Sequence, residues 1–210
     1  MSVAQITACS LNPYKCGGPG GCSGGLPQVG YQYAEFYGVA NETEYPYEDR
    51  RTNCEYDASI MTSRVFVRGY ETLPRNDYDS IINHVANVGP LSVVITTRWS
   101  DMKAYGGGVY KDCPYDEDIS LNHVVQLIGY GTDEEHGDFW LLRNSWGSVW
   151  GDKGYFKFAR EKEIHCGVDT SNDGNLADVC NGDGQTSQKV CGMCGILYDP
   201  SFPIGASKTR

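Results

Sequence analysis

The sequence predicts an α+β protein, with helices and loops in the first third and a twisted antiparallel sheet or barrel in the second half. Three observations support this class. Two segments carry apolar residues at helical spacing, four later runs are rich in β-branched and aromatic residues, and the links between these runs are short. The 210 residues, 40% of them hydrophobic, suffice for one large domain or two small ones.

The first helix is expected at residues 27–37, after a segment at 16–25 that is too rich in glycine to be regular. Pro27 is a favoured first residue of a helix, and Gly38 is a favoured residue at its end. The apolar face of this helix consists of Val29, Tyr33, Phe36 and Tyr37.

The remaining elements follow in order along the chain. After an irregular connection at 45–54, residues 64–70 alternate like a strand, and residues 77–89 predict a second helix that ends at Gly89. Further strands are expected at 91–96, 123–131, 138–144 and 154–160. Residues 171–190 lose apolar periodicity and predict a long surface loop.

Charge and composition exclude two classes of protein. The net charge is -10, and recognition of a nucleic-acid backbone needs clustered Lys and Arg, so a nucleic-acid partner is not expected. No apolar run approaches eighteen residues, so no membrane span is expected. Nine cysteines favour an oxidising compartment, in which the sequon at Asn41 would be a glycan acceptor.

The chemistry centres on His123 and Asn144. His123 begins one predicted strand and Asn144 ends the next, so an antiparallel hairpin would bring them side by side. An amide oxygen can orient an imidazole without adding a negative charge, which suits a thiolate partner. Trp146 could keep water away from that hydrogen bond. A lone histidine beside a strand is usually structural, and we interpret His84, His136 and His165 as surface or structural residues.

Seven motifs in order resemble the papain family of cysteine proteases, which includes the cathepsins. They are GCSGG (21–25), YPYE (45–48), GPLSVVI (89–95), GGGVYKDC (106–113), LNHVVQLIGYG (121–131), FWLLRNSWGSVWGDKGYF (139–156) and CGILYDPSFP (194–203). The resemblance implies a papain-like two-domain fold. Residues 1–88 would be the remainder of a helical left domain, and residues 89–210 an antiparallel β-barrel right domain with a loop insertion at 171–190.

The resemblance also implies roles for individual residues. His123 would be the catalytic imidazole, Asn144 its orienting amide and Trp146 the shield over their contact. The substrate-binding residues would be Gly24, Gly25, Leu26, Pro27, Leu91, Asn122 and Asp199. Gly25 would bind the peptide substrate through its backbone as an added strand. Asp199 would favour a basic side chain two residues before the cut, although CGVDTS (166–171) imitates the same ending and would place Ser171 there.

The sequence departs from the family at the nucleophile. The family cysteine lies in C-G-[SA]-C-[WY], well upstream of the histidine, whereas the C-G-x-C of this chain lies at 191–194, after His123. Residues 1–20 also lack a signal for export. We therefore expect the thiolate on an upstream segment or chain that completes the left domain, and residues 1–210 alone to be inactive. The alternative is a truncated, catalytically dead homologue that acts as a structural or binding subunit.

The resemblance implies two disulfides, Cys9 with Cys54, and Cys113 with Cys194 or Cys166. Cys22 would pair with a cysteine in the upstream segment. The remaining cysteines cannot be assigned from spacing. The CxxC at 191–194 has no second CxxC to form a zinc site, so disulfides are the better reading, and the proposed chemistry requires no metal or organic cofactor. The expected location is lysosomal or vacuolar, or secreted, and the partner is a peptide or protein substrate.

Overall fold

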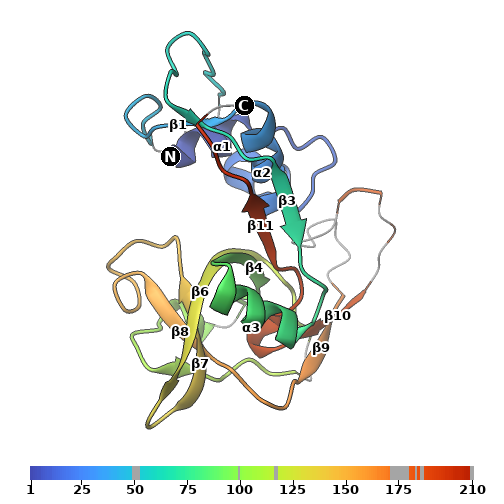
Figure 1. Cartoon of the computed structure of the whole chain (residues 1–210). Coiled ribbons are helices and arrows are strands. Elements are labelled where there is room, and N and C mark those ends of the chain that lie inside the picture. The colour runs from blue at the N-terminus through green and yellow to red at the C-terminus, as the bar shows by residue number, and fades with distance from the viewer. Residues whose placement is uncertain are drawn as a thin grey trace. The chain divides into compact units, whose positions relative to one another are not determined.

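The computed structural model describes residues 1–48, 53–98, 100–115, 118–170, 180–182, 184 and 187–208. It forms two compact units (Figure 1). Unit 1 comprises Met1–Glu71, Val179–Asp183 and Phe202–Arg210, and unit 2 comprises Thr72–Asp178 and Gly184–Ser201. Helices and an antiparallel-rich sheet occur together, so the predicted α+β class is confirmed.

Unit 1 contains the short helices and small strands of the first part of the chain. Its helices are α1 (Val3–Cys9), the 3-10 turn η1 (Gly21–Ser23) and α2 (Pro27–Phe36). Its strands are β1 (Val39–Ala40), β2 (Arg64–Val65), β3 (Gly69–Thr72) and β11 (Ser201–Ile204), of which β3 and β11 each have one terminal residue in unit 2. Strand β1 pairs with β2, and β3 lies beside β11. The helix predicted from residue 27 is confirmed, whereas the strand predicted over 64–70 is divided into β2 and β3.

A buried glutamine organises the core of unit 1. Gln5 is fully buried in α1 and donates from Nε2 to the Tyr33 hydroxyl at 2.9 Å and to the Gly38 carbonyl at 3.1 Å. Its Oε1 accepts from the Ala40 amide at 2.7 Å, so the whole side-chain amide is satisfied. The Gln5 side chain therefore joins α1 to α2 through Tyr33, and to the chain at and just before β1 through Ala40 and Gly38.

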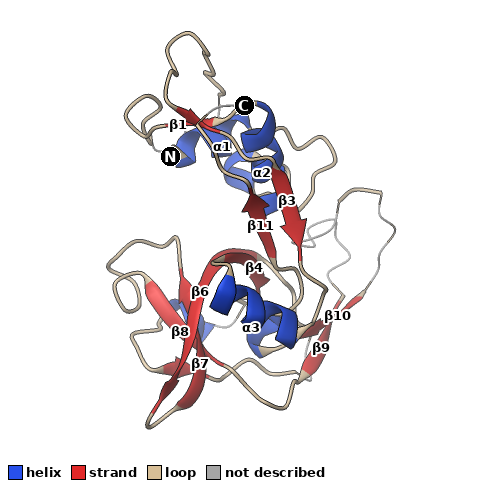
Figure 2. Cartoon of the chain, viewed as in Figure 1, coloured by secondary structure: helices blue, strands red, loops and turns tan. Residues whose placement is uncertain are grey.

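Unit 2 contains the larger sheet. Its helices are α3 (Tyr78–Asn87), α4 (Ser100–Lys103) and the 3-10 turn η2 (Met193–Gly195). Its strands are β4 (Leu91–Ile95), β5 (Val109–Tyr110), β6 (His123–Asp133), β7 (Gly137–Arg143), β8 (Tyr155–Ala159), β9 (Cys166–Asp169) and β10 (Gln188–Cys191). The sheet runs in the order β4-β6-β7-β8-β5, and its pairs are antiparallel except β5 with β8. Figure 2 shows α3 beside these strands, and α3 packs against β6.

The units divide the chain differently from the predicted domains at 1–88 and 89–210. Helix α3 lies in unit 2 because it packs against β6, and residues 202–210 lie in unit 1. Of the predicted loop at 171–190, residues 171–179, 183, 185 and 186 lie outside the described residues. The loop prediction is wrong for residues 188–190, which belong to β10 and pair with β9, where Gln188 and Val190 are buried and Lys189 is exposed.

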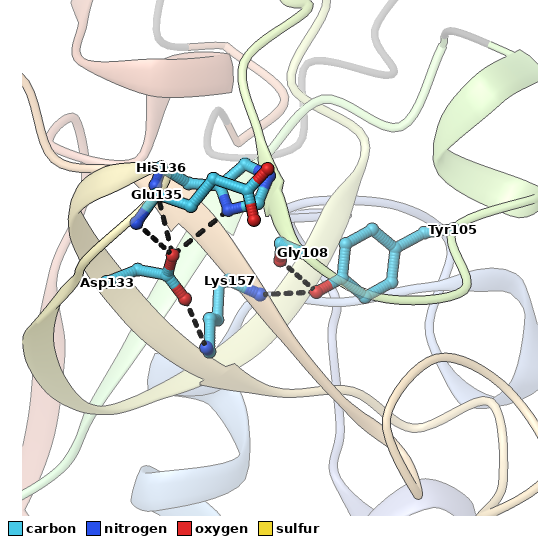
Figure 3. A network of polar contacts seen from close by, with 6 residues as sticks. All are labelled: Tyr105, Gly108, Asp133, Glu135, His136 and Lys157. Atoms are coloured by element: carbon cyan, nitrogen blue, oxygen red, sulfur yellow. Dashed lines mark hydrogen bonds and ion pairs between the residues drawn. The ribbon is translucent and has the colours of Figure 1, made fainter.

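The turn between β6 and β7 is held by one carboxylate. Asp133 Oδ1 accepts from the backbone amides of Glu135 and His136 and lies 3.0 Å from the ring Nδ1 of His136 (Figure 3). Its Oδ2 lies 3.5 Å from the Lys157 ammonium. These contacts, foremost the one with the His136 ring, lower the pKa of the Asp133 carboxyl to about 2. His136 thus has the structural role that the sequence indicates.

Helices in the described part of the chain are too short or too polar to cross a membrane.

Candidate active site

The hairpin of β6 and β7 brings together the two side chains that the sequence analysis paired. His123 is the first residue of β6, and Asn144 directly follows the last residue of β7. The ring Nε2 of His123 lies 2.8 Å from Asn144 Oδ1. Because an amide oxygen only accepts hydrogen bonds, Nε2 carries the proton, and in the neutral ring Nδ1 is the basic nitrogen.

The Asn144 side chain is itself held in place. Its Oδ1 also accepts from the Ser145 backbone amide at 2.8 Å, which fixes the oxygen toward His123. Burial lowers the pKa of His123 below its ordinary value of 6.5, and the hydrogen bond to Asn144 opposes this shift by favouring the charged ring. Asn144 Nδ2 is buried and has no hydrogen-bond partner among the described residues. The arrangement therefore orients the imidazole, and burial favours its neutral form.

Two tryptophans pack on this pair. The Trp146 ring lies 5.0 Å from the His123 ring between centroids, at an interplanar angle of 31°. Trp150 meets Trp146 edge to face at 4.9 Å, and its indole N–H donates to the Lys103 carbonyl at 3.1 Å. Trp150 was not among the predicted site residues, although its position four residues after Trp146 in the same glycine-containing run was a signal for it. Trp146 therefore covers one side of the imidazole with apolar surface, and Trp150 packs against Trp146.

The other predicted residues of unit 2 differ in their exposure. Leu91 is fully buried at the start of β4, and Asp199 is 7% exposed within a buried stretch at 191–201. Asn122 is exposed, and its Oδ1 accepts from the backbone amide and the hydroxyl of Thr97. Ser171, the other candidate for the specificity position, lies outside the described residues. The substrate-binding roles of these residues stay predictions.

The predicted substrate-binding residues of unit 1 follow one another at the start of α2. Gly24 has φ +102°, and a Cβ there would lie 3.0 Å from the Gly17 carbonyl oxygen, so the position requires glycine. Gly25 is exposed, Leu26 is the N-cap of α2, and Pro27 is its first residue. The Leu26 amide donates to the Cys16 carbonyl at 3.1 Å, which closes the glycine-rich loop.

Eight of the nine cysteines form disulfides. Cys9 pairs with Cys54, as the resemblance implies, and Cys113 pairs with Cys194, which is one of the two partners that the resemblance left open. Two further pairs are Cys16 with Cys180 and Cys166 with Cys191. Both cysteines of the CxxC at 191–194 are therefore oxidised, and neither can be a nucleophile. Cys22 is the free cysteine, and it is exposed.

Among the described residues there is no group of three or more His, Cys, Asp or Glu side chains that could hold a metal ion.

The comparison with known families decides the assignment. The family model described as "Papain family cysteine protease" matches residues 1–175. The chain belongs to the papain family. A Cathepsin L-like protein of Caenorhabditis elegans is 41% identical over 174 residues, which cover 81% of this chain and 49% of that protein. Testin-2 of Rattus norvegicus is 39% identical over 154 residues, which cover 71% of this chain and 45% of that protein.

Solved structures give the same fold. The digestive procathepsin L2 proteinase of Tenebrio molitor larval midgut matches with a TM-score of 0.71 and 31% identity, over 97% of this chain and 53% of that one. The bromelain protease of Ananas comosus, solved in complex with the E64 inhibitor, matches with a TM-score of 0.69 and 27% identity, over 96% of this chain and 76% of that one. The papain-like fold is therefore confirmed. The chain spans about half the length of the curated relatives it matches.

Proposed function

We propose that the protein is a cysteine-type peptidase that hydrolyses peptide bonds with His123 and Asn144 as two of its catalytic groups. The observation that carries the proposal is the 2.8 Å contact between His123 Nε2 and Asn144 Oδ1. Membership of the papain family supports it. The nucleophile would be a thiolate on a segment or chain outside residues 1–210, because the CxxC cysteines are oxidised and the chain spans about half of its relatives.

The reaction is acyl transfer in two steps. His123 takes the thiol proton, and the thiolate attacks the peptide carbonyl carbon to form the carbon–sulfur bond. The carbon–nitrogen bond then breaks as His123 gives its proton to the leaving amine. In the second step His123 takes a proton from water and the resulting hydroxide attacks the carbonyl carbon of the thioester. The carbon–sulfur bond then breaks, which releases the acid product and regenerates the enzyme thiolate beside protonated His123. The hydrogen bond to Asn144 keeps Nε2 protonated throughout, so Nδ1 is the ring nitrogen that accepts and donates each transferred proton.

The substrate would bind as an extended peptide. Gly25 would pair with it through its backbone, and Asp199 would favour arginine or lysine two residues before the cut. The alternative is that Ser171, and not Asp199, contacts the substrate side chain two residues before the cut. A substrate library that returned only large apolar side chains at that position would contradict the role of Asp199.

The location of the protein follows from its cysteines. Four disulfides support an oxidising compartment, and we propose a lysosomal, vacuolar or secreted protein that carries a glycan on Asn41. Asn41 and Thr43 of the sequon are both exposed, which leaves the asparagine accessible to the glycan-transferring enzyme.

An epoxide probe for reactive thiols tests the proposed function on the full-length protein. We expect one labelled cysteine in a C-G-S-C-W-like segment, with labelling and peptide cleavage both abolished by His123→Ala. His165→Ala is the matched control, because His165 is exposed and lies outside the His123–Asn144 pair, and it should leave both unchanged. If the folded protein is neither labelled nor active and contains no such segment, the peptidase proposal fails. The second candidate then applies, a structural or binding subunit without its own nucleophile, which the oxidised state of Cys191 and Cys194 favours.

A further inference from the structure

The glycine loop, residues 16–26, is shaped by one side chain outside it. Asn12 is half-buried, and its Oδ1 accepts from the Cys16 backbone amide at 2.8 Å. Its Nδ2 donates to the Cys16 carbonyl at 2.9 Å and to the Gly18 carbonyl at 2.8 Å. One acceptor and both donor hydrogens of the amide are therefore engaged with the backbone of the loop.

These contacts meet the point at which the loop closes. The Cys16 carbonyl that Asn12 binds also accepts from the Leu26 amide at 3.1 Å, so the two ends of the loop join beside the Asn12 side chain. A Cβ built on Gly25 would lie 3.6 Å from Asn12 Nδ2, which places this amide in contact range of the Gly25 backbone. The Asn12 side chain thus lies next to Gly25, at the place where the two ends of the loop meet.

The loop is also anchored covalently. Cys16 forms a disulfide with Cys180, and the amide of the next residue, Asn181, donates to the Tyr14 carbonyl at 2.7 Å. All of these residues belong to unit 1. Because Cys16 is fixed on one side by the disulfide and on the other by Asn12, the loop has little freedom at its base.

Gly25 needs such support if it is to bind a peptide. It is exposed, and its backbone N–H and C=O make no hydrogen bond to any described residue. An exposed backbone with unpaired N–H and C=O groups can add a peptide strand. A glycine-rich segment loses much conformational entropy when it is fixed, so a loop held in shape beforehand binds more tightly than a free one.

We propose that Asn12 is a positioning residue for substrate binding, which holds the glycine loop so that Gly25 is presented to the peptide. This inference rests on the proposed function, in which Gly25 binds the substrate backbone. Asn12 itself does not touch the reacting atoms. It affects the binding of the peptide rather than the chemical step, and this division distinguishes it from a residue that only stabilises the fold.

The test compares Asn12→Ala and Asn12→Asp with the full-length parent protein. Alanine removes all three contacts, whereas aspartate keeps an acceptor for the Cys16 amide but sets a carboxylate oxygen against two carbonyl oxygens. Asn87→Ala is the matched control, because Asn87 is an exposed asparagine that donates to the Asn83 carbonyl within α3.

Two readouts separate this inference from the proposed function. The first is hydrogen exchange at the Leu26 amide, which should become faster by about tenfold or more in both Asn12 variants and stay unchanged in the control. The second is binding of an N-acetylated hexapeptide amide with a basic residue in the proposed specificity position, followed through the Gly25 amide resonance. Its Kd, and KM where the protein is active, should rise by about fivefold or more, with kcat within about twofold of the parent.

Each result has a definite meaning. Unchanged Leu26 exchange in the Asn12 variants overturns the inference whether or not the protein binds peptides. Faster exchange with unaltered peptide affinity also overturns it, because the loop would then not need to be held. If the parent protein does not bind the peptide, the proposed function fails and the inference fails with it, and the exchange result shows separately that Asn12 holds the loop.

Discussion

Replacing Asn144 with alanine tests the central contact of the site. The change removes the acceptor that lies 2.8 Å from His123 Nε2 and leaves the backbone of the turn intact. A hydrogen bond to a charged group contributes about 1.5–3 kcal/mol, and His123 is charged when it faces a thiolate. At about 1.4 kcal/mol per factor of ten, kcat/KM of the full-length protein should fall by about 10–150-fold, measured with a fluorogenic peptide.

The same variant changes the titration of His123. Since the contact with Asn144 favours the charged ring, its loss lowers the pKa of His123 further below 6.5, as measured by NMR of the ring protons. Trp146→Ala should act in the opposite direction, because removing the neighbouring ring exposes the imidazole to water and raises its pKa. An unchanged or raised His123 pKa in Asn144→Ala would refute the reasoning.

Protein stability should follow these titrations. The folded pKa of His123 lies below its unfolded value, so the unfolded chain takes up the proton first as the pH falls. The contribution of neutral His123 to the free energy of unfolding is therefore fully present above about pH 6.5. It is lost as the pH falls from there through the folded pKa. Asn144→Ala should deepen this acid loss, and Trp146→Ala should reduce it, as measured by urea unfolding at a series of pH values.

Three further predictions concern other parts of the protein. Gly167→Ala should destabilise unit 2 by about 1–3 kcal/mol in urea unfolding, because the added Cβ would lie 2.5 Å from Ile119 Cδ1. Gly106→Ala is the control. Nothing lies within 4 Å of its Cβ, so the stability should change by less than about 1 kcal/mol. Asp133→Asn should destabilise the fold near pH 6 but not near pH 2. The pKa of the Asp133 carboxyl is about 2 in the folded protein, so the contribution of the carboxylate to the free energy of unfolding is lost as the pH falls from about 4 to 2. Equal effects of the substitution at both pH values would contradict this prediction. Asn41→Gln should remove the mass of one glycan from protein made in a secretory pathway, and an unchanged mass would exclude glycosylation at Asn41.

The structural elements that could be predicted from the sequence are those in which a pattern repeats over several residues. The alternating runs of β6, β7 and β8 predicted an antiparallel sheet, and the position of His123 and Asn144 at opposite ends of adjacent strands predicted their contact. Helix α1 was not predicted, since it has only seven residues and no apolar periodicity over that length. Its signal was Ser2 followed by Gln5, and the Gln5 side chain is used for tertiary contacts that no local pattern encodes.

The partner of Cys113 could not be chosen from sequence because two cysteines stand in equivalent contexts, Cys166 before Gly-Val and Cys194 before Gly-Ile. Strand pairing makes the choice. Cys166 and Cys191 are direct register partners in the antiparallel pair of β9 and β10, with Cα atoms 4.0 Å apart, so these two are joined locally. Cys194 is then the cysteine that remains for Cys113. The sequence could not predict the Cys166–Cys191 pairing, because residues 171–190 were predicted as a loop and the pairing depends on strand β10.

The same pairing bears on substrate preference. If the disulfide to Cys113 marks the end of the chain that corresponds to the family's, then the residue five positions after Cys194 takes the specificity position, and that residue is Asp199. Ser171 stands five positions after Cys166, whose disulfide instead closes the β9–β10 pair. Asp199 lies in the buried stretch that leads into Ser201, where β11 bridges to β4 at Ser92 next to Leu91. The family match, however, covers residues 1–175 and so includes Ser171 but not Asp199. Asp199 and Ser171 stay alternative predictions for the specificity position, and a preference for a basic substrate side chain is the prediction that goes with Asp199.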